Sequence, residues 1–151
     1  MIGIFALVLL GIGAASQVGT HTGGIRITLE RTGCSLDFTC PVYKLTLAGD
    51  GSVVYEGRHA VHALGIRKSK IEPSAVRQLA QTLNDKGYFD FPTSYGVCDD
   101  GYSVKTSFEL NGRIKAIEDS CHAGPAELHK LEDEIDRVSG SQRWVSGPPR
   151  S

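Results

Sequence analysis

Alternating apolar and polar residues predict the strands of this chain. Residues 25–31 alternate throughout, and residues 43–47 repeat the pattern. A period of two is typical of a strand with one buried face. The Gly-Asp-Gly sequence at 49–51 supplies the positive φ of a tight hairpin turn, so residues 52–56 are expected to return as the partner strand. A fourth strand is predicted over residues 59–66.

Helical periodicity predicts two helices. After Pro73, a residue tolerated in a first turn, apolar residues fall at i, i+3, i+4 and i+7: Val76, Leu79, Ala80 and Leu83. Gly87 is expected to end this helix. A second helix opens at Pro125, with the apolar stripe Leu128, Leu131, Ile135 and Val138. Its acidic residues are expected on a solvated outer face: Glu132, Asp133, Glu134 and Asp136.

A second hairpin lies between the helices. Residues 103–110 and 113–119 flank Asn-Gly at 111–112, the strongest short-range hairpin signal in the chain. The predicted order is ββββ-α-ββ-α. We therefore expect an α+β domain, an antiparallel sheet of about six strands with two helices on one face. The Trp-Val pair at 144–145 is expected to dock back onto it.

The N-terminus has the pattern of a secretion signal. Residues 2–12 are an almost unbroken apolar run without a charge, and small residues follow at 13–16. Eleven helical residues rise only about 16 Å, too short for a hydrocarbon core of about 30 Å. The absence of Lys or Arg before the run departs from a standard signal. A buried N-terminal element is the alternative, which the polar, Gly- and Thr-rich stretch that follows disfavours.

The expected organisation is a signal peptide at 1–16, a flexible spacer at 17–24, one α+β domain at 25–145 and a disordered tail at 146–151. The mature protein is expected to be exported, periplasmic or secreted, with no membrane span after cleavage. Hydrophobic residues make up 40% of the chain and charged residues 22%, as in globular domains. A formal net charge of −1 argues against nucleic-acid binding, which needs many Lys and Arg.

Four cysteines remain after the signal: Cys34, Cys40, Cys98 and Cys121. Three pairings are open. We favour Cys34–Cys40, which closes a short loop, and Cys98–Cys121, which lies at the open end of the second predicted hairpin. A zinc site fits the spacings poorly, because Cys-x5-Cys has no matching second pair. A reactive thiol is the remaining alternative.

The histidines give weak signals. His59 and His62 are close in sequence, but residues three apart on a strand point to opposite faces, so regular β structure cannot direct both to one metal. His122 directly follows Cys121, yet a disulfide-bonded sulfur is no nucleophile. We predict no metal ligands and no catalytic residues from these positions.

Four carboxylates are expected to gather near the open end of the second hairpin: Asp99, Asp100, Glu118 and Asp119. Such a group can bind Ca²⁺ or supply an acid/base pair. A solvated loop rim is the simpler interpretation, so Asp99, Asp100 and Asp119 are only weak candidates for a binding site. No nucleophile-elbow, zincin, P-loop or dinucleotide-binding string occurs in the sequence, and no cofactor is expected.

Three strings carry a resemblance to a known family. Residues 31–34 read Arg-Thr-Gly-Cys, 40–43 read Cys-Pro-Val-Tyr, and 50–57 read Asp-Gly-Ser-Val-Val-Tyr-Glu-Gly. Together they resemble the bacterial domain-of-unknown-function family numbered six-four-three-eight. The similarity continues to the Trp-Val pair at 144–145 and so covers nearly all of the expected domain. It implies an exported or envelope-associated bacterial protein without an assigned activity.

Two hypotheses for function follow. The first is a non-enzymatic binding or protein-interaction module of the cell envelope, with an envelope or extracellular protein as its partner. The second is a small extracytoplasmic enzyme or metal-binding protein that uses the acidic loop or a reactive thiol. The absence of a catalytic set favours the first.

Overall fold

The computed structural model describes residues 24–33, 39–98 and 101–147. Its strands are β1 (Ile25–Thr32), β2 (Val42–Ala48), β3 (Ser52–His59), β4 (Gly65–Lys70), β5 (Ser94–Tyr95), β6 (Ser103–Leu110) and β7 (Arg113–Ser120). Its helices are α1 (Pro73–Asp85), the 3-10 turn η1 (Tyr88–Asp90), α2 (Ala126–Ser139) and α3 (Gln142–Val145). The predicted order is confirmed, with β5, η1 and α3 added to it.

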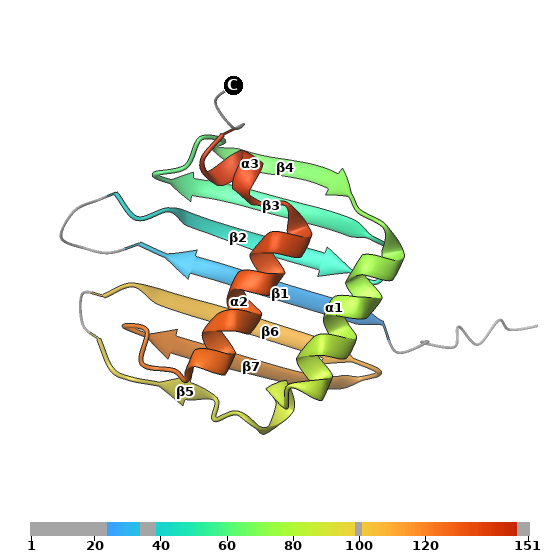
Figure 1. The fold of residues 1–151 in the computed structure, drawn as a ribbon. Coiled ribbons are helices and arrows are strands. Elements are labelled where there is room, and N and C mark those ends of the chain that lie inside the picture. Colours follow the sequence, from blue (N-terminus) through green and yellow to red (C-terminus); the bar gives the residue numbers. More distant parts are fainter. Residues whose placement is uncertain (1–23, 34–38, 99–100, 148–151) are drawn as a thin grey trace, which may run out of the picture.

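The strands form one sheet in the order β4-β3-β2-β1-β6-β7-β5 (Figure 1). All neighbouring pairs are antiparallel except β5 and β7, which are parallel. The first four strands form a meander that grows in one direction from β1. After α1, the β6–β7 hairpin adds to the other side of β1. The strand β1 therefore lies at the centre of the sheet, and β4 forms one edge.

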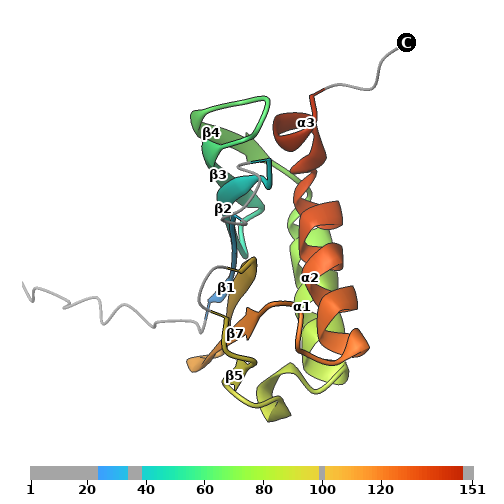
Figure 2. The same cartoon turned by 90° about the vertical axis from the view of Figure 1, so that its left-hand side faces the viewer.

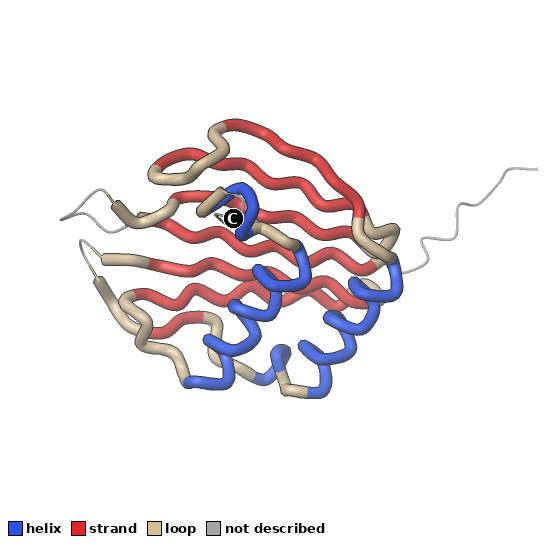
Figure 3. The backbone as a smooth tube through the Cα atoms, turned by 45° about the horizontal axis from the view of Figure 1, so that its top comes forward, coloured by secondary structure: helices blue, strands red, loops and turns tan. Residues whose placement is uncertain are grey.

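Two long helices cover one face of the sheet (Figure 2). They lie side by side across the strands in both Figure 1 and Figure 3. The core between the layers holds alternate residues of the strands and the predicted helix stripes, because inward positions recur every second residue in a strand. Its largest buried side chains include Tyr55, Tyr88, Phe108, Ile27, Leu29, Leu45, Leu47, Leu79, Leu83, Leu128 and Ile135.

The opposite face of the sheet is crossed by a row of alternating charges. The register places Glu56 opposite Lys44, Lys44 opposite Glu30, and Glu30 opposite Lys105. Lys105 in turn lies opposite Glu118, with 3.3 Å between nitrogen and oxygen. Opposite charges on neighbouring strands stabilise a sheet by about 0.2–1 kcal/mol per pair. Such a row suits a face in contact with water.

The strand predicted over residues 59–66 is placed wrongly. The strand β3 runs on to its end at His59, and β4 starts only at Gly65. Positive φ angles at Ala60 (50°) and Gly65 (77°) break the extended backbone. Between them, the N–H groups of His62 and Ala63 donate to carbonyls of α3 at 2.9 and 2.8 Å. A tertiary contact with α3 therefore determines the conformation of this segment.

The C-terminal segment docks back as predicted. The ring of Trp144 packs on Tyr55 with centroids 5.0 Å apart, and Tyr55 packs on Tyr43 at 5.7 Å. Arg143 lies over the ring of Trp144 and donates to Ser69. These contacts hold α3 against the β3–β4 side of the sheet.

The predicted signal peptide at 1–16, most of the spacer and residues 148–151 of the tail lie outside the described residues, so these assignments stay predictions. Within the described part of the chain, every helix is too short or too polar to cross a bilayer.

Candidate functional site

Polar side chains gather under α2 at one end of the sheet. The first group, named here the Asp119 triad, comprises Asp119, His122 and His129. Asp119 lies on the inner face of β7 and is fully buried, so the expectation that it sits on a solvated rim is wrong. Glu118 faces the other side of the sheet, because neighbours on a strand alternate. Asp99 and Asp100 lie outside the described residues.

Both oxygens of Asp119 have partners. Its Oδ1 accepts from the Gly124 N–H at 2.8 Å, and its Oδ2 lies 2.8 Å from Nε2 of His129 on α2. The imidazole nitrogen and the carboxylate oxygen therefore share one hydrogen bond. A Cβ at position 124 would stand 3.0 Å from Oδ2, so glycine permits this close approach. The backbone thus fixes one oxygen and leaves the other to the imidazole.

His122 completes the triad from the loop between β7 and α2. Its ring stacks on that of His129 with centroids 3.4 Å apart and planes 13° apart. Cys121 and His122 both have φ of 56°, a left-handed conformation that side chains rarely adopt. The Cys98–Cys121 disulfide and a 2.8 Å bond from the Cys121 N–H to the Tyr102 carbonyl hold this loop.

The Cys98–Cys121 pairing is confirmed, with the two Cα atoms 6.0 Å apart. Cys34 lies outside the described residues, so Cys34–Cys40 stays a prediction. The described part of the chain holds no free thiol. Within the described ranges, the Asp119 triad is the group of three whose metal-ligating atoms all lie within 4.8 Å of one another.

A second polar group, named here the Arg31 network, lies further along α2. It comprises Arg31, Tyr43, Tyr102 and Asp136. The guanidinium of Arg31 lies 2.8 Å from Oδ2 of Asp136, and the Tyr43 hydroxyl donates to Oδ1 of the same carboxylate at 2.8 Å. Arg31 also donates to the Tyr102 hydroxyl. Arg31 and Tyr43 belong to the strings that carry the family resemblance, and the fold brings both onto one carboxylate.

Charge in the Arg31 network shifts the ionisation of its members. Burial lowers the pKa of Arg31, but its interactions with Asp136, Tyr43 and Tyr102 together outweigh that effect and hold the pKa above its ordinary value. Burial, together with the negative charge of Asp136, raises the pKa of Tyr43. Arg31 is therefore a fixed cation and Tyr43 a neutral hydrogen-bond donor at neutral pH.

Glu132 lies one helical turn from His129 and one from Asp136. It is only 2% exposed, and its Oε1 has no hydrogen-bond partner among the described residues. Burial raises the pKa of Glu132 to about 7; Arg31 opposes that shift, whereas Asp119, Asp133 and Asp136 add to it. Glu132 thus interacts electrostatically with Asp119 of the Asp119 triad and with Arg31 and Asp136 of the Arg31 network.

The expectation that the four acidic residues of α2 form a solvated face is therefore wrong for two of them. Asp133 is 81% exposed, but Glu132 and Asp136 turn toward the sheet. The sequence held a usable signal. His129, Glu132, Asp136 and Ser139 each follow a residue of the apolar stripe by one position, so they form a polar stripe beside it on the helix. Whether such a polar stripe faces the sheet or the solvent can be decided only when a polar partner on the sheet, such as Arg31, is known.

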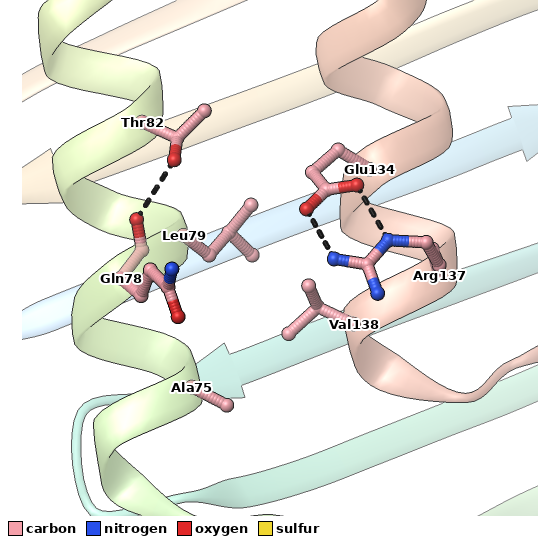
Figure 4. A pocket seen from close by; sticks show the side chains of 7 residues that line it. All are labelled: Ala75, Gln78, Leu79, Thr82, Glu134, Arg137 and Val138. Carbon is pink, nitrogen blue, oxygen red and sulfur yellow. Dashed lines mark hydrogen bonds and ion pairs between the residues drawn. The ribbon is translucent and has the colours of Figure 1, made fainter.

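A cavity of about 320 Å³ lies between α1 and α2. In Figure 4, Glu134 and Arg137 pair with each other on α2, and Thr82 bonds back to the Gln78 carbonyl on α1. The side chains of Glu134, Arg137 and Thr82 thus form hydrogen bonds within their own helix. The cavity brings together no acid/base pair aimed at a common point.

The edge strand β4 combines exposed apolar and charged side chains. Leu64, just before the strand, and Ile66 are 60% and 61% exposed, beside the cations Arg67, Lys68 and Lys70. No strand of the described sheet pairs with its outer side.

The fold and its two buried polar groups define a disulfide-linked α+β domain. A family model described as "Domain of unknown function (DUF6438)" matches residues 25–139. The chain belongs to this family, which confirms the resemblance found in the sequence. No curated protein matches the chain.

Proposed function

We propose that the protein is an exported, non-enzymatic interaction module of the cell envelope. Its partner presents an extended acidic segment, which pairs with the edge strand β4. The observation that carries the proposal is a strand edge that pairs with no strand of the described sheet and combines exposed apolar side chains with three cations. Recognition by strand addition draws affinity from backbone bonds and specificity from alternate side chains.

The register identifies the backbone groups that face the open edge. The Ile71 N–H donates to the Gly51 carbonyl at 2.9 Å at the end of the β3–β4 ladder. Antiparallel ladders bond every second residue. The N–H and C=O groups of Ile66, Lys68 and Lys70 therefore point outward. The Arg67 guanidinium bonds the Ile66 carbonyl at 2.9 Å, which agrees with an outward carbonyl that lacks a strand partner.

The side chains of β4 favour an acidic partner. Cations on an edge strand repel a second copy of the same edge and so limit self-association. Protection alone does not require Leu64 and Ile66 to be exposed beside those cations. Ile66, Lys68 and Lys70 share one face of β4, so a partner strand with Glu at every second residue would place its carboxylates beside Lys68 and Lys70. The one ion pair that Lys70 makes, with Asp50 at 3.8 Å, is exposed and easily exchanged.

Export is supported by two features of different kinds. The apolar run at 2–12 followed by small residues has the pattern of a signal peptide. The Cys98–Cys121 disulfide is of the type that persists in oxidising compartments.

The test uses a fluorescein-labelled peptide of alternating Glu and Val and the oxidised protein, followed by fluorescence anisotropy. We expect saturable binding with a Kd in the micromolar range, and slower amide exchange at Ile66, Lys68 and Lys70. The Lys68→Glu/Lys70→Glu variant should bind at least tenfold more weakly. The control is Lys86→Glu, just beyond the C-terminal end of α1, which should bind as the native protein does.

A peptide of alternating Lys and Val should not bind. Equal affinity of the acidic peptide for the native and charge-reversed proteins would contradict the proposal. So would the absence of binding, or protection of amides elsewhere than on β4.

A further inference from the structure

We infer that Asp119, His122 and His129 form a binding site for a divalent transition-metal ion of the Zn²⁺ class. The three side chains come from the end of β7, from the following loop and from α2, so the fold brings together residues that are apart in sequence. Their donor atoms, one from each side chain, all lie within 4.8 Å of one another.

The donor set selects the class of metal. Two imidazole nitrogens and one carboxylate oxygen suit Zn²⁺ and its neighbours, whereas Ca²⁺ and Mg²⁺ prefer oxygen ligands. Three protein ligands with an open fourth position are typical of zinc sites that remain accessible to water. His122 is exposed, and Asp119 is fully buried, so the triad is open on the loop side and closed toward the core.

The distances require only small movements. Bonds of about 2.0–2.1 Å in a tetrahedron place ligand atoms about 3.3 Å apart. Oδ2 of Asp119 and Nε2 of His129 stand 2.8 Å apart and need to separate by about half an ångström. The metal takes the place of the hydrogen now between them. An imidazole binds a metal through a ring nitrogen that carries no hydrogen, so Nε2 of His129 would coordinate in the tautomer with its hydrogen on Nδ1.

His122 must turn its ring. The lone pairs of an imidazole lie in the ring plane, so two rings stacked face to face cannot direct them at one ion. His122 can turn because it lies on an exposed loop, whereas Asp119 and His129 are fixed by their mutual bond and by Gly124. A carboxylate oriented by a second hydrogen bond is the usual support of a metal ligand.

The backbone at His122 gives an independent reason to assign it a role. A side chain in the left-handed conformation costs about 1–2 kcal/mol, a cost that glycine avoids. At Cys121 the same conformation serves the disulfide. The exposed imidazole of His122 fills no core position, so the fold holds a strained residue whose contact is the stack on His129. Strain of this kind concentrates at functional sites.

The experiment is a calorimetric titration of the oxidised, untagged protein with ZnCl₂. Oxidised protein keeps Cys98 and Cys121 from acting as ligands. We expect one Zn²⁺ per chain with a Kd of micromolar or tighter, and no measurable binding of Ca²⁺. The His122→Ala variant should bind at least 30-fold more weakly. The control, His59→Ala, changes an exposed histidine outside the triad and should leave the affinity unchanged.

A second variant separates folding from binding. His122→Gly suits φ of 56° and should melt at a higher temperature than His122→Ala, while it binds Zn²⁺ equally weakly. Native affinity in both His122 variants, a loss of affinity in His59→Ala, or no heat with Zn²⁺ would each overturn the inference. The triad and β4 lie toward opposite edges of the sheet, so this outcome is independent of peptide binding.

Discussion

At the scale of single residues, the buried acid Glu132 sets a pH dependence. Its side chain lies between Asp119, Asp136 and the Arg31 guanidinium, and burial raises its pKa to about 7. A carboxyl group in that environment favours the neutral form, because the charged form loses hydration that its neighbours do not fully replace. The folded protein therefore holds a proton that an unfolded glutamate, with an ordinary pKa of 4.5, has released.

The prediction concerns Glu132→Gln. Because the folded state binds the extra proton, the native free energy of unfolding should receive a falling contribution from Glu132 as pH rises from about 4.5 to about 7. Glutamine removes this contribution, so the variant should gain stability relative to the native protein over that range. Urea unfolding at a series of pH values measures the difference. A difference that is constant with pH would show that Glu132 does not titrate in this way.

At the scale of elements, the Arg31 network ties α2 to the centre of the sheet. Asp136 accepts from Arg31 on β1, from Tyr43 on β2 and from Ser141 beyond the helix end. Apolar packing sets the height of α2 over the sheet, but it is tolerant of sliding. The directed bonds to Asp136 fix its position along its axis, which keeps His129 opposite Asp119.

Asp136→Ala tests this anchoring. Removal of one partner leaves the Arg31 cation buried without its main counter-charge, so we expect a loss of about 3 kcal/mol in the free energy of unfolding. Replacement of both, as Arg31→Met with Asp136→Leu, should restore most of it. The control on the same helix is Glu134→Ala, whose surface pair with Arg137 contributes about 0–1 kcal/mol. Equal losses in Asp136→Ala and Glu134→Ala would contradict the anchoring role.

At the scale of the whole molecule, the disulfide closes the side of the sheet that the β6–β7 hairpin leaves open. Cys98 and Cys121 are separated by 23 positions, and their bond fixes Cys98, which follows β5, against the end of β7. The loop that carries His122 follows directly. The crosslink therefore stabilises the fold and holds the position of the proposed metal site.

Replacement of both residues, as Cys98→Ser/Cys121→Ser, should lower the free energy of unfolding by about 3 kcal/mol, because a loop of this length gains that much freedom in the unfolded chain. Urea unfolding measures it. The control adds a reductant to this variant, where a further loss is expected if the predicted Cys34–Cys40 pair also forms. Unchanged stability in the double variant would show that the bond does not constrain the fold.

The sequence alone determined the elements whose cause is local. The hairpin turns at 49–51 and 111–112, the apolar stripe of each helix and the end of α1 just before Gly87 all depend on residues a few positions apart. The Cys98–Cys121 pair was also predictable, because it follows from one hairpin. Composition and family strings correctly indicated a domain without an assigned activity.

Only the tertiary structure decided which polar residues meet. The sequence places Asp119 among loop carboxylates, but its partners are Gly124 and His129, because the path of α2 across the sheet lies outside any local pattern. Glu132 looked like a surface acid for the same reason. Apolar burial follows a short-range period that a sequence displays, whereas the contact of two polar groups depends on the three-dimensional arrangement of the elements that carry them.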